Sequence, residues 1–114
     1  MASDCLFCKF VSKEIRPNLA YEDDQVMVFH DIHPQAPVHA LVIPKKHIDS
    51  VSAIPSGDPI VSILTERAVK VAAQLGIAQE GFRLVFNNGH NGGQTISHLH
   101  LHLLGGRPMA WPPG

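Results

Sequence analysis

The segment His98-Leu99-His100-Leu101-His102-Leu103-Leu104 alternates histidine and leucine almost to its end. Successive side chains of an extended strand point to opposite faces, so the three histidines share one face and the leucines between them share the other. Leucines suit a hydrophobic core, whereas each imidazole carries two ring nitrogens that need partners. We therefore predict a strand whose histidine face borders a cleft. A solvated histidine-rich face, or a tract that collects metal, is the alternative.

A polar, glycine-rich stretch leads into this strand, because residues 87–98 read NNGHNGGQTISH. The backbone N–H groups of Gly92-Gly93-Gln94-Thr95 and the threonine hydroxyl are suited to hold the oxygens of an anion. A Gly-Gly pair alone more often marks a turn. Beside a row of imidazoles, it favours a site that holds phosphate while a nucleophile attacks.

Length and composition favour one globular domain over residues 1–114. The formal net charge is −1, so we expect neither nucleic acid nor a membrane as a partner. No apolar run is long enough to span a bilayer, and the first residues, MASDCLFC, lack the pattern of a signal peptide. Two cysteines are too few for a disulfide scaffold. A cytoplasmic location is therefore expected, or an organelle if a targeting peptide has been removed.

Hydrophobic periodicity and turn residues predict one short helix, one long helix and five strands. The short helix covers residues 6–11 after a cap at Ser3 or Asp4, and the long one runs from Asp58-Pro59 to Gly76. The strands are expected at residues 19–21, 26–29, 38–44, 82–87 and 98–104. This order predicts an α+β domain with a mainly antiparallel sheet. The tail, residues 105–114, is expected to be irregular and to dock on its own body or on a partner subunit.

Three chemistries could use the His-x-His-x-His pattern. It could ligate a metal ion, perform general acid–base catalysis, or supply an imidazole that attacks phosphorus. Histidine ligands are usually oriented by carboxylates or carbonyls, and no acidic residue lies between Glu80 and the C-terminus. That gap argues against the metal interpretation. The phosphate-type loop favours nucleophilic catalysis.

The same segment resembles the signature of the histidine triad (HIT) proteins, in which three histidines alternate with apolar residues. The similarity extends along most of the chain through the stretches CLFCK, EDD, FHDIHPQAPVH, LVIPKKH, GGQTISHLHLHLLGGR and WPPG. In order and spacing these are similar to the Hint branch, the histidine triad nucleotide-binding proteins. The resemblance implies a HIT-like fold with a five-stranded sheet, and a homodimer in which two sheets join into one of ten strands.

The resemblance further implies a hydrolase that cleaves the P–N bond of purine nucleoside 5′-phosphoramidates and releases AMP or GMP. It implies a nucleotidyl intermediate on His100 and no cofactor for the reaction. The alternatives are a non-catalytic purine nucleotide-binding or scaffold dimer, a metal-dependent hydrolase, and a dinucleoside polyphosphate hydrolase of the sister HIT branch.

Individual roles also follow from the resemblance. His98 and His39 would relay the proton of the leaving group, and His102 would contact the phosphate. The phosphate would be bound by Asn87, Gly93, Gln94 and Thr95, the ribose by Asp31, and the base by Phe29 and Ile32. Trp111 would belong to a tail that reaches the partner's site. Thr95 stands where this branch commonly has serine, which bears on the preferred leaving group because threonine is stiffer at χ1.

The pair Cys5-x-x-Cys8 is left open by the sequence. Together with His47, and with His98 as a fourth ligand, it could bind a structural zinc ion, as in some bacterial relatives of the family. Alternatively, both thiols pack in the first helix. If His98 is a zinc ligand, it is no longer free to serve in the proton relay.

Overall fold

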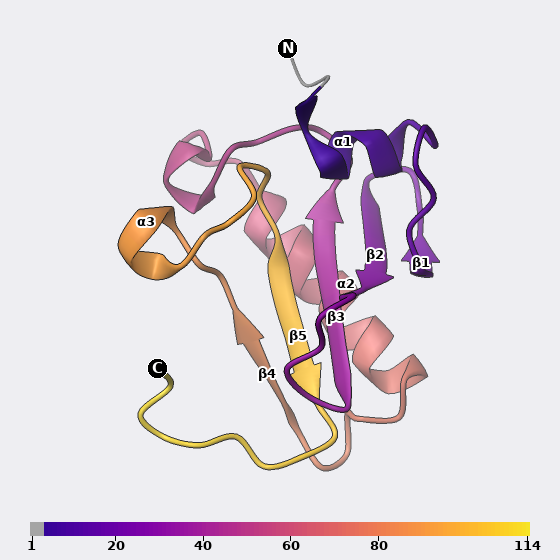
Figure 1. Cartoon of the computed structure of the whole chain (residues 1–114), viewed down its shortest axis with the longest axis vertical. Coiled ribbons are helices and arrows are strands. Elements are labelled where there is room, and N and C mark those ends of the chain that lie inside the picture. Colours follow the sequence, from indigo (N-terminus) through magenta and orange to yellow (C-terminus); the bar gives the residue numbers. More distant parts are fainter. Residues whose placement is uncertain (1–3) are drawn as a thin grey trace.

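The computed structural model describes residues 4–114 and shows a five-stranded sheet with helices on both of its faces (Figure 1). The elements in chain order are α1 (Leu6–Val11), β1 (Leu19–Glu22), β2 (Val26–His30), β3 (Val38–Pro44), the 3₁₀ turn η2 (Val51–Ala53), α2 (Ile60–Gln74), β4 (Phe82–Val85), α3 (Gly89–Gly92) and β5 (Leu101–Gly105). The predicted α+β class is confirmed. None of the helices within residues 4–114 is long and apolar enough to cross a membrane.

The strand order in the sheet is β1-β2-β3-β5-β4, and every neighbouring pair is antiparallel. The last strand therefore lies inside the sheet, between β3 and β4. Its register pairs His102 with Leu41 and Leu104 with His39. As a result, histidines far apart in the sequence come side by side on one face.

The two faces of the sheet have separate cores. On one face α2 packs over small and branched residues of the central strands, together with Leu99, Leu101 and Leu103. On the other face α1 contributes Phe7 to a smaller cluster with Met27, Phe29, Leu41 and Ile43. Figure 1 shows α2 behind the sheet and α1 across the upper end of β2 and β3. The leucine face of the terminal segment is thus core, as its alternation predicts.

The long helix begins at Ile60, one residue after the predicted first helical position Pro59, and Gly76 follows its C-cap as the sequence predicts. The Asp58 carboxylate accepts a hydrogen bond from the Ile60 N–H at 3.0 Å, which satisfies one of the unpaired donors of the first turn. Gly76 ends the helix at a φ of 78°, a backbone conformation that glycine adopts without steric cost. Ile60, Leu64, Ala68 and Val71 form the buried stripe between these ends.

Three predicted boundaries are wrong. The last strand begins at Leu101, so His98 and His100 precede it in an irregular segment. The fourth strand ends at Val85, and the glycine-rich stretch after it contains the helical turn α3. The N-cap of α1 is Cys5, whose sulfur accepts a hydrogen bond from the Cys8 N–H, whereas Ser3 lies outside the described residues. For His98 and for Cys5, side-chain contacts rather than local periodicity accompany the changed boundary.

Candidate functional site

His100 is held with one ring nitrogen engaged and the other available. The ring is 6% exposed, and its Nδ1 lies 2.7 Å from the backbone oxygen of His98. A carbonyl oxygen can only accept, so Nδ1 carries the proton and donates it. In the neutral ring Nε2 then has a free lone pair. Because His100 also lines a cavity, Nε2 is the nitrogen that can attack an electrophile bound there.

His39 and His102 form a hydrogen-bonded pair between β3 and β5. The backbone N–H of Gln35 donates to Nδ1 of His39 at 3.0 Å, so the proton of the neutral His39 ring is on Nε2. That Nε2–H donates to Nδ1 of His102, 2.9 Å away. His102 therefore carries its own proton on Nε2. A single backbone amide thus fixes both tautomers, and His102 offers an N–H donor to the cavity that it lines.

Burial keeps this pair of imidazoles neutral. Burial, with His100 and His39 nearby, lowers the pKa of His102 to about 4. Burial also lowers the pKa of His39, although the Asp31 carboxylate 3.5 Å from its Nε2 opposes the shift. Asp31 is therefore placed to stabilise a proton that reaches the pair during a reaction.

A cavity of about 230 Å³ lies beside His100 and His102. Most of its wall is apolar and comes from α1, β2, β3 and the segment before β5, through Leu6, Phe7, Phe10, Phe29, Leu41 and Ile96. Phe29 packs edge-on against Phe7 and Phe10, with ring centroids 5.1 and 4.9 Å apart. Asp31 and Thr95 add polar groups, and Ile32 contributes to the lining while 83% exposed. An apolar wall that ends in imidazoles suits an aromatic ring joined to a polar reacting group.

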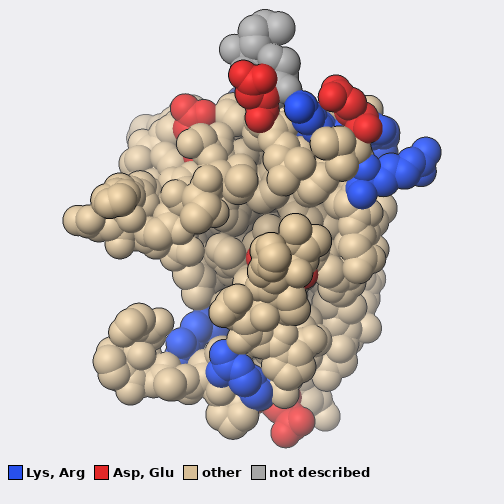
Figure 2. Space-filling view, viewed as in Figure 1, with Lys and Arg blue, Asp and Glu red and all other residues tan. Residues whose placement is uncertain are grey.

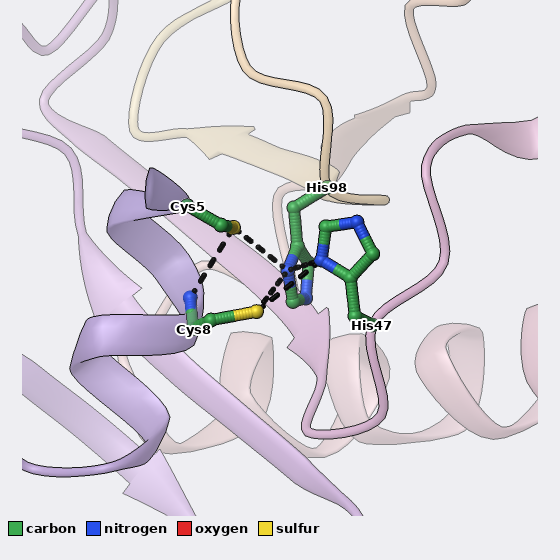
Figure 3. A group of neighbouring side chains, drawn as sticks. All are labelled: Cys5, Cys8, His47 and His98. Carbon is green, nitrogen blue, oxygen red and sulfur yellow. Dashed lines mark hydrogen bonds between the residues drawn. The ribbon is translucent and has the colours of Figure 1, made fainter. Parts of the chain in front are cut away.

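A second cluster lies at the beginning of α1, where Cys5, Cys8, His47 and His98 converge (Figure 3). The sulfur of Cys8 is 3.2 Å from Nδ1 of His47 and 3.5 Å from Nδ1 of His98. The sulfur of Cys5 is 3.3 Å from Nδ1 of His98. The two Nδ1 atoms are 3.0 Å apart.

When both rings are neutral, their outer nitrogens carry the protons and these Nδ1 atoms are unprotonated. Nε2 of His47 lies 2.7 Å from the Asp49 carboxylate, and Nε2 of His98 lies 3.0 Å from the backbone oxygen of Pro44. Both partners only accept, so both Nε2 atoms carry protons. Two nitrogen lone pairs then face each other beside two sulfurs. A cation among the four atoms would stabilise this arrangement, because it attracts the lone pairs of all four.

The comparisons with known proteins identify the family. The HIT domain family matches residues 12–109, and an uncharacterized HIT-like protein of Synechocystis is 51% identical over the full length of both chains. The chain belongs to the HIT domain family. A 14 kDa zinc-binding protein of Brassica juncea is 46% identical to it, over 97% of this chain and all of that one. A solved HIT family hydrolase of Legionella pneumophila has a TM-score of 0.94 and 47% identity, over 97% of this chain and all of that one.

The second cluster of this HIT domain could bind zinc. Two thiolates and two imidazoles are a common ligand set for structural zinc. With Zn–S and Zn–N bonds of about 2.3 and 2.0 Å, the ligand atoms of a tetrahedral site are about 3.3–3.8 Å apart. The separations of 3.2, 3.3 and 3.5 Å between sulfur and nitrogen in the structure are close to that range. Four protein ligands leave no open coordination position, so such an ion would hold parts of the chain together.

The placement of His98 differs from its predicted role in a proton relay. Its ring contacts the cysteines, His47 and Pro44, while the partner of His39 is His102. The side chain therefore turns away from the pair that it was expected to join. The carboxylates missing from the sequence around the histidine strand come from elsewhere, since Asp49 orients His47 and Asp31 lies beside His39. The lack of acidic residues near the histidines in the sequence therefore does not argue against a metal site, because the carboxylates come from distant segments.

The glycine-rich loop uses several of its expected phosphate donors internally. The backbone N–H groups of Gly93 and Gln94 donate to the carbonyls of His90 and Gly89, which closes α3. The Gln94 side-chain N–H₂ donates to Asp49 and Ile96 backbone oxygens. Gln94 thus secures the loop. Thr95 lines the cavity, and Asn87 follows β4 at the end of the sheet where β5 begins.

The remaining residues are placed as follows. Trp111 is 80% exposed on the irregular tail, where Arg83 lies 6.0 Å from its ring and donates to the Ala110 carbonyl. Sequence reasoning missed Asp49 and the α1 residues Leu6, Phe7 and Phe10 as parts of the two sites. The apolar spacing of α1 was visible, but it could not show which surface the helix covers.

Proposed function

We propose that this HIT domain hydrolyses the P–N bond of purine nucleoside 5′-phosphoramidates through a nucleotidyl intermediate on His100. The supporting observation is the Nδ1–H bond from His100 to the His98 carbonyl, which leaves a lone pair on Nε2 beside the cavity. A neutral imidazole is a nucleophile at neutral pH and also a good leaving group on the return step. As a member of the Hint branch, the chain would be a purine nucleoside phosphoramidase.

The reaction proceeds in two displacements. Nε2 of His100 forms a bond to phosphorus while the P–N bond to the amine breaks, and the departing amine takes one proton from solvent water, with the Thr95 hydroxyl at its side. A water molecule then attacks phosphorus and releases one proton to the solvent, while the bond to Nε2 breaks and its electron pair returns to the ring. In both steps His102 donates its Nε2–H to a phosphate oxygen, and the His39–Asp31 pair behind it stabilises the charge that develops.

The rest of the nucleotide is accommodated by the apolar part of the cavity. Phe29 and Ile32 flank the base, and the Asp31 carboxylate accepts hydrogen bonds from the ribose hydroxyls. Asn87 and Thr95 complete the phosphate contacts. Gly93 and Gln94 act through the loop shape, because their N–H groups already have partners.

The charges around the cavity support a phosphoramidate over a polyphosphate. No lysine or arginine occurs among the described residues that line it. In the view of Figure 2, the lysine and arginine side chains lie toward the top and the bottom of the molecule, and mostly uncharged residues lie between them. Neutral donors suit the single charge of a nucleoside phosphoramidate better than the several charges of a dinucleoside polyphosphate. We extend the proposal to a homodimer with one ten-stranded sheet, in which the tail and Trp111 reach the partner's site.

The intermediate on His100 is tested by base-quenched trapping. Adenosine 5′-phosphoramidate mixed with the protein should leave an AMP adduct on His100, found by peptide mass spectrometry. His100→Asn should lower kcat/KM by at least about 10⁴-fold, because the nucleophile is lost while the rest of the site remains. AMP should still bind to this variant.

The control is Lys70→Gln, an exposed change on α2 that should leave turnover unaltered. An adduct on another residue, or turnover without His100, would exclude the mechanism. Faster cleavage of dinucleoside polyphosphates than of phosphoramidates would identify the protein as a dinucleoside polyphosphate hydrolase instead.

A further inference from the structure

Helix α1 contributes to both sites of the molecule. Cys5 and Cys8 flank the pair Leu6-Phe7 in the sequence, and these two apolar side chains line the nucleotide cavity. A helix of six residues is too short to be stable alone, so its position depends on tertiary contacts. Those contacts are the aromatic packing of Phe7 and Phe10 on Phe29 and the cysteine–histidine cluster (Figure 3).

His98 connects the same cluster to the nucleophile. Its side chain belongs to the cluster, while its backbone oxygen accepts the His100 Nδ1–H at 2.7 Å. The segment around these residues is outside β5, so the sheet ladder does not hold it. It is held instead by the His98 ring and by a hydrogen bond from Leu99 N–H to the Ile48 carbonyl, next to His47. The Phe7 ring contacts both the His98 and His100 rings edge-on, at 5.8 and 5.3 Å between centroids.

We infer that the Cys5–Cys8–His47–His98 cluster, when it holds a metal ion, positions the wall of the nucleotide cavity and the carbonyl that orients His100, so that metal and nucleotide bind cooperatively. The inference rests on the proposed function and deepens it. Without the ion, the four ligand atoms lose the shared bonds that would hold them together. Helix α1 and the His98 backbone then lose a common anchor. Cooperativity between two sites is reciprocal, so the nucleotide must strengthen metal binding by the factor by which metal strengthens nucleotide binding.

The experiment compares the full-length protein loaded with zinc and stripped of it under reducing conditions. AMP affinity is measured by calorimetry, and amide hydrogen exchange is followed in α1 and α2. We expect the dissociation constant of AMP to be at least about fivefold larger in the stripped protein. Exchange should accelerate in α1 while α2 stays protected. In a competition with a chromophoric chelator, AMP should raise the zinc affinity by the same factor.

The variant Asp49→Asn tests the coupling even if the wild-type protein unfolds when zinc is removed, because it weakens zinc binding without removing a ligand. The Asp49 side chain is 70% exposed and is not among the residues that line the nucleotide cavity, and its carboxylate is hydrogen-bonded to the outer nitrogen of His47. Losing such an outer partner typically weakens metal binding by about 10–100-fold. This variant should therefore bind AMP weakly at limiting zinc and normally once excess zinc is added. Asp24→Asn, the same chemical change at an exposed turn, should bind AMP normally at both zinc levels.

Each outcome decides between the two proposals. Equal AMP affinity in loaded and stripped folded protein, or equal zinc affinity with and without AMP, would overturn the coupling and leave the proposed function standing. If the AMP affinity of Asp49→Asn does not change when zinc is added, the coupling is likewise overturned and the proposed function stands. Failure of the zinc-loaded wild type to bind AMP would overturn both.

Discussion

At the scale of single residues, the roles of His98 and His100 are distinguished by the partners of their two ring nitrogens. His100 donates from Nδ1 to a carbonyl and keeps Nε2 free, whereas His98 donates from Nε2 to a carbonyl and turns Nδ1 to the cysteines. The residues are chemically identical and two positions apart. Their backbone surroundings alone make one a candidate nucleophile and the other a candidate metal ligand.

The buried His102 should make stability depend on pH in mildly acidic solution. Burial lowers its pKa to about 4, below the usual value near 6.5, so the unfolded chain binds more protons between these two values. The free energy of unfolding should therefore fall as the pH falls from about 6.5 to about 4. Urea unfolding across this range measures the slope. His102→Asn, which retains an acceptor for His39, should show a shallower slope.

The comparison between the wild type and His102→Asn isolates His102, because the two proteins differ at this residue alone. Identical slopes would mean that His102 is protonated in the folded state at the same pH as in the unfolded chain.

At the scale of elements, the turn between β1 and β2 is joined to α2 through Asp23. One carboxylate oxygen accepts hydrogen bonds from the backbone N–H groups of Gln25 and Val26, and the other accepts from Tyr21 and from Arg67 of α2. Although partial burial alone would raise it, these hydrogen bonds hold the pKa of Asp23 well below its usual range. Its contribution is therefore present above about pH 4 and is lost as the pH falls toward the lowered pKa.

Asp23→Asn should lower the free energy of unfolding at pH 7 by about 1–3 kcal/mol, the usual worth of a hydrogen bond to a charged group. The amide keeps the shape of the side chain but loses the charge that faces Arg67. Chemical denaturation at pH 7 measures the change. Asp24→Asn at the neighbouring exposed position serves as the control and should be nearly neutral. A loss that is equally large for both variants would assign the effect to the turn and not to the contact with α2.

At the scale of the whole molecule, the cysteine–histidine cluster joins three segments that are distant in the sequence: the start of α1, the residues after β3, and the approach to β5. Burial and the neighbouring Cys5 raise the pKa of the Cys8 thiol to about 11 in the absence of a cation. Metal binding must therefore displace protons, and its free energy adds to the stability of the folded chain.

Zinc should raise the melting temperature. At free zinc near 100 times the dissociation constant, a ligand that binds only the folded chain adds about 2.7 kcal/mol, or roughly 10–20 °C for a domain of this size. Thermal scans with and without a chelator measure the shift, and elemental analysis should find one zinc per chain. The double variant Cys5→Ser and Cys8→Ser should show no shift with zinc. A shift of the same size in that variant would place the metal elsewhere.

The sequence by itself determined the class of fold and the chemistry available to it. Alternation of leucine with histidine specifies which side chains enter the core, since a strand has a period of two residues. The Asp58 cap, the apolar stripe and Gly76 specify α2, because these signals act within the helix. The candidate nucleophile and the four candidate metal ligands were all visible as residue types.

Only the tertiary structure decided how those residues are divided between the two sites. The early end of the histidine strand, the turn of His98 toward the cysteines, the pairing of His39 with His102 and the carboxylates of Asp31 and Asp49 all depend on contacts between distant segments. Local patterns report which face a side chain prefers. They cannot report the partner of each ring nitrogen, because that partner is set by the packing of β3, β5 and α1 against one another.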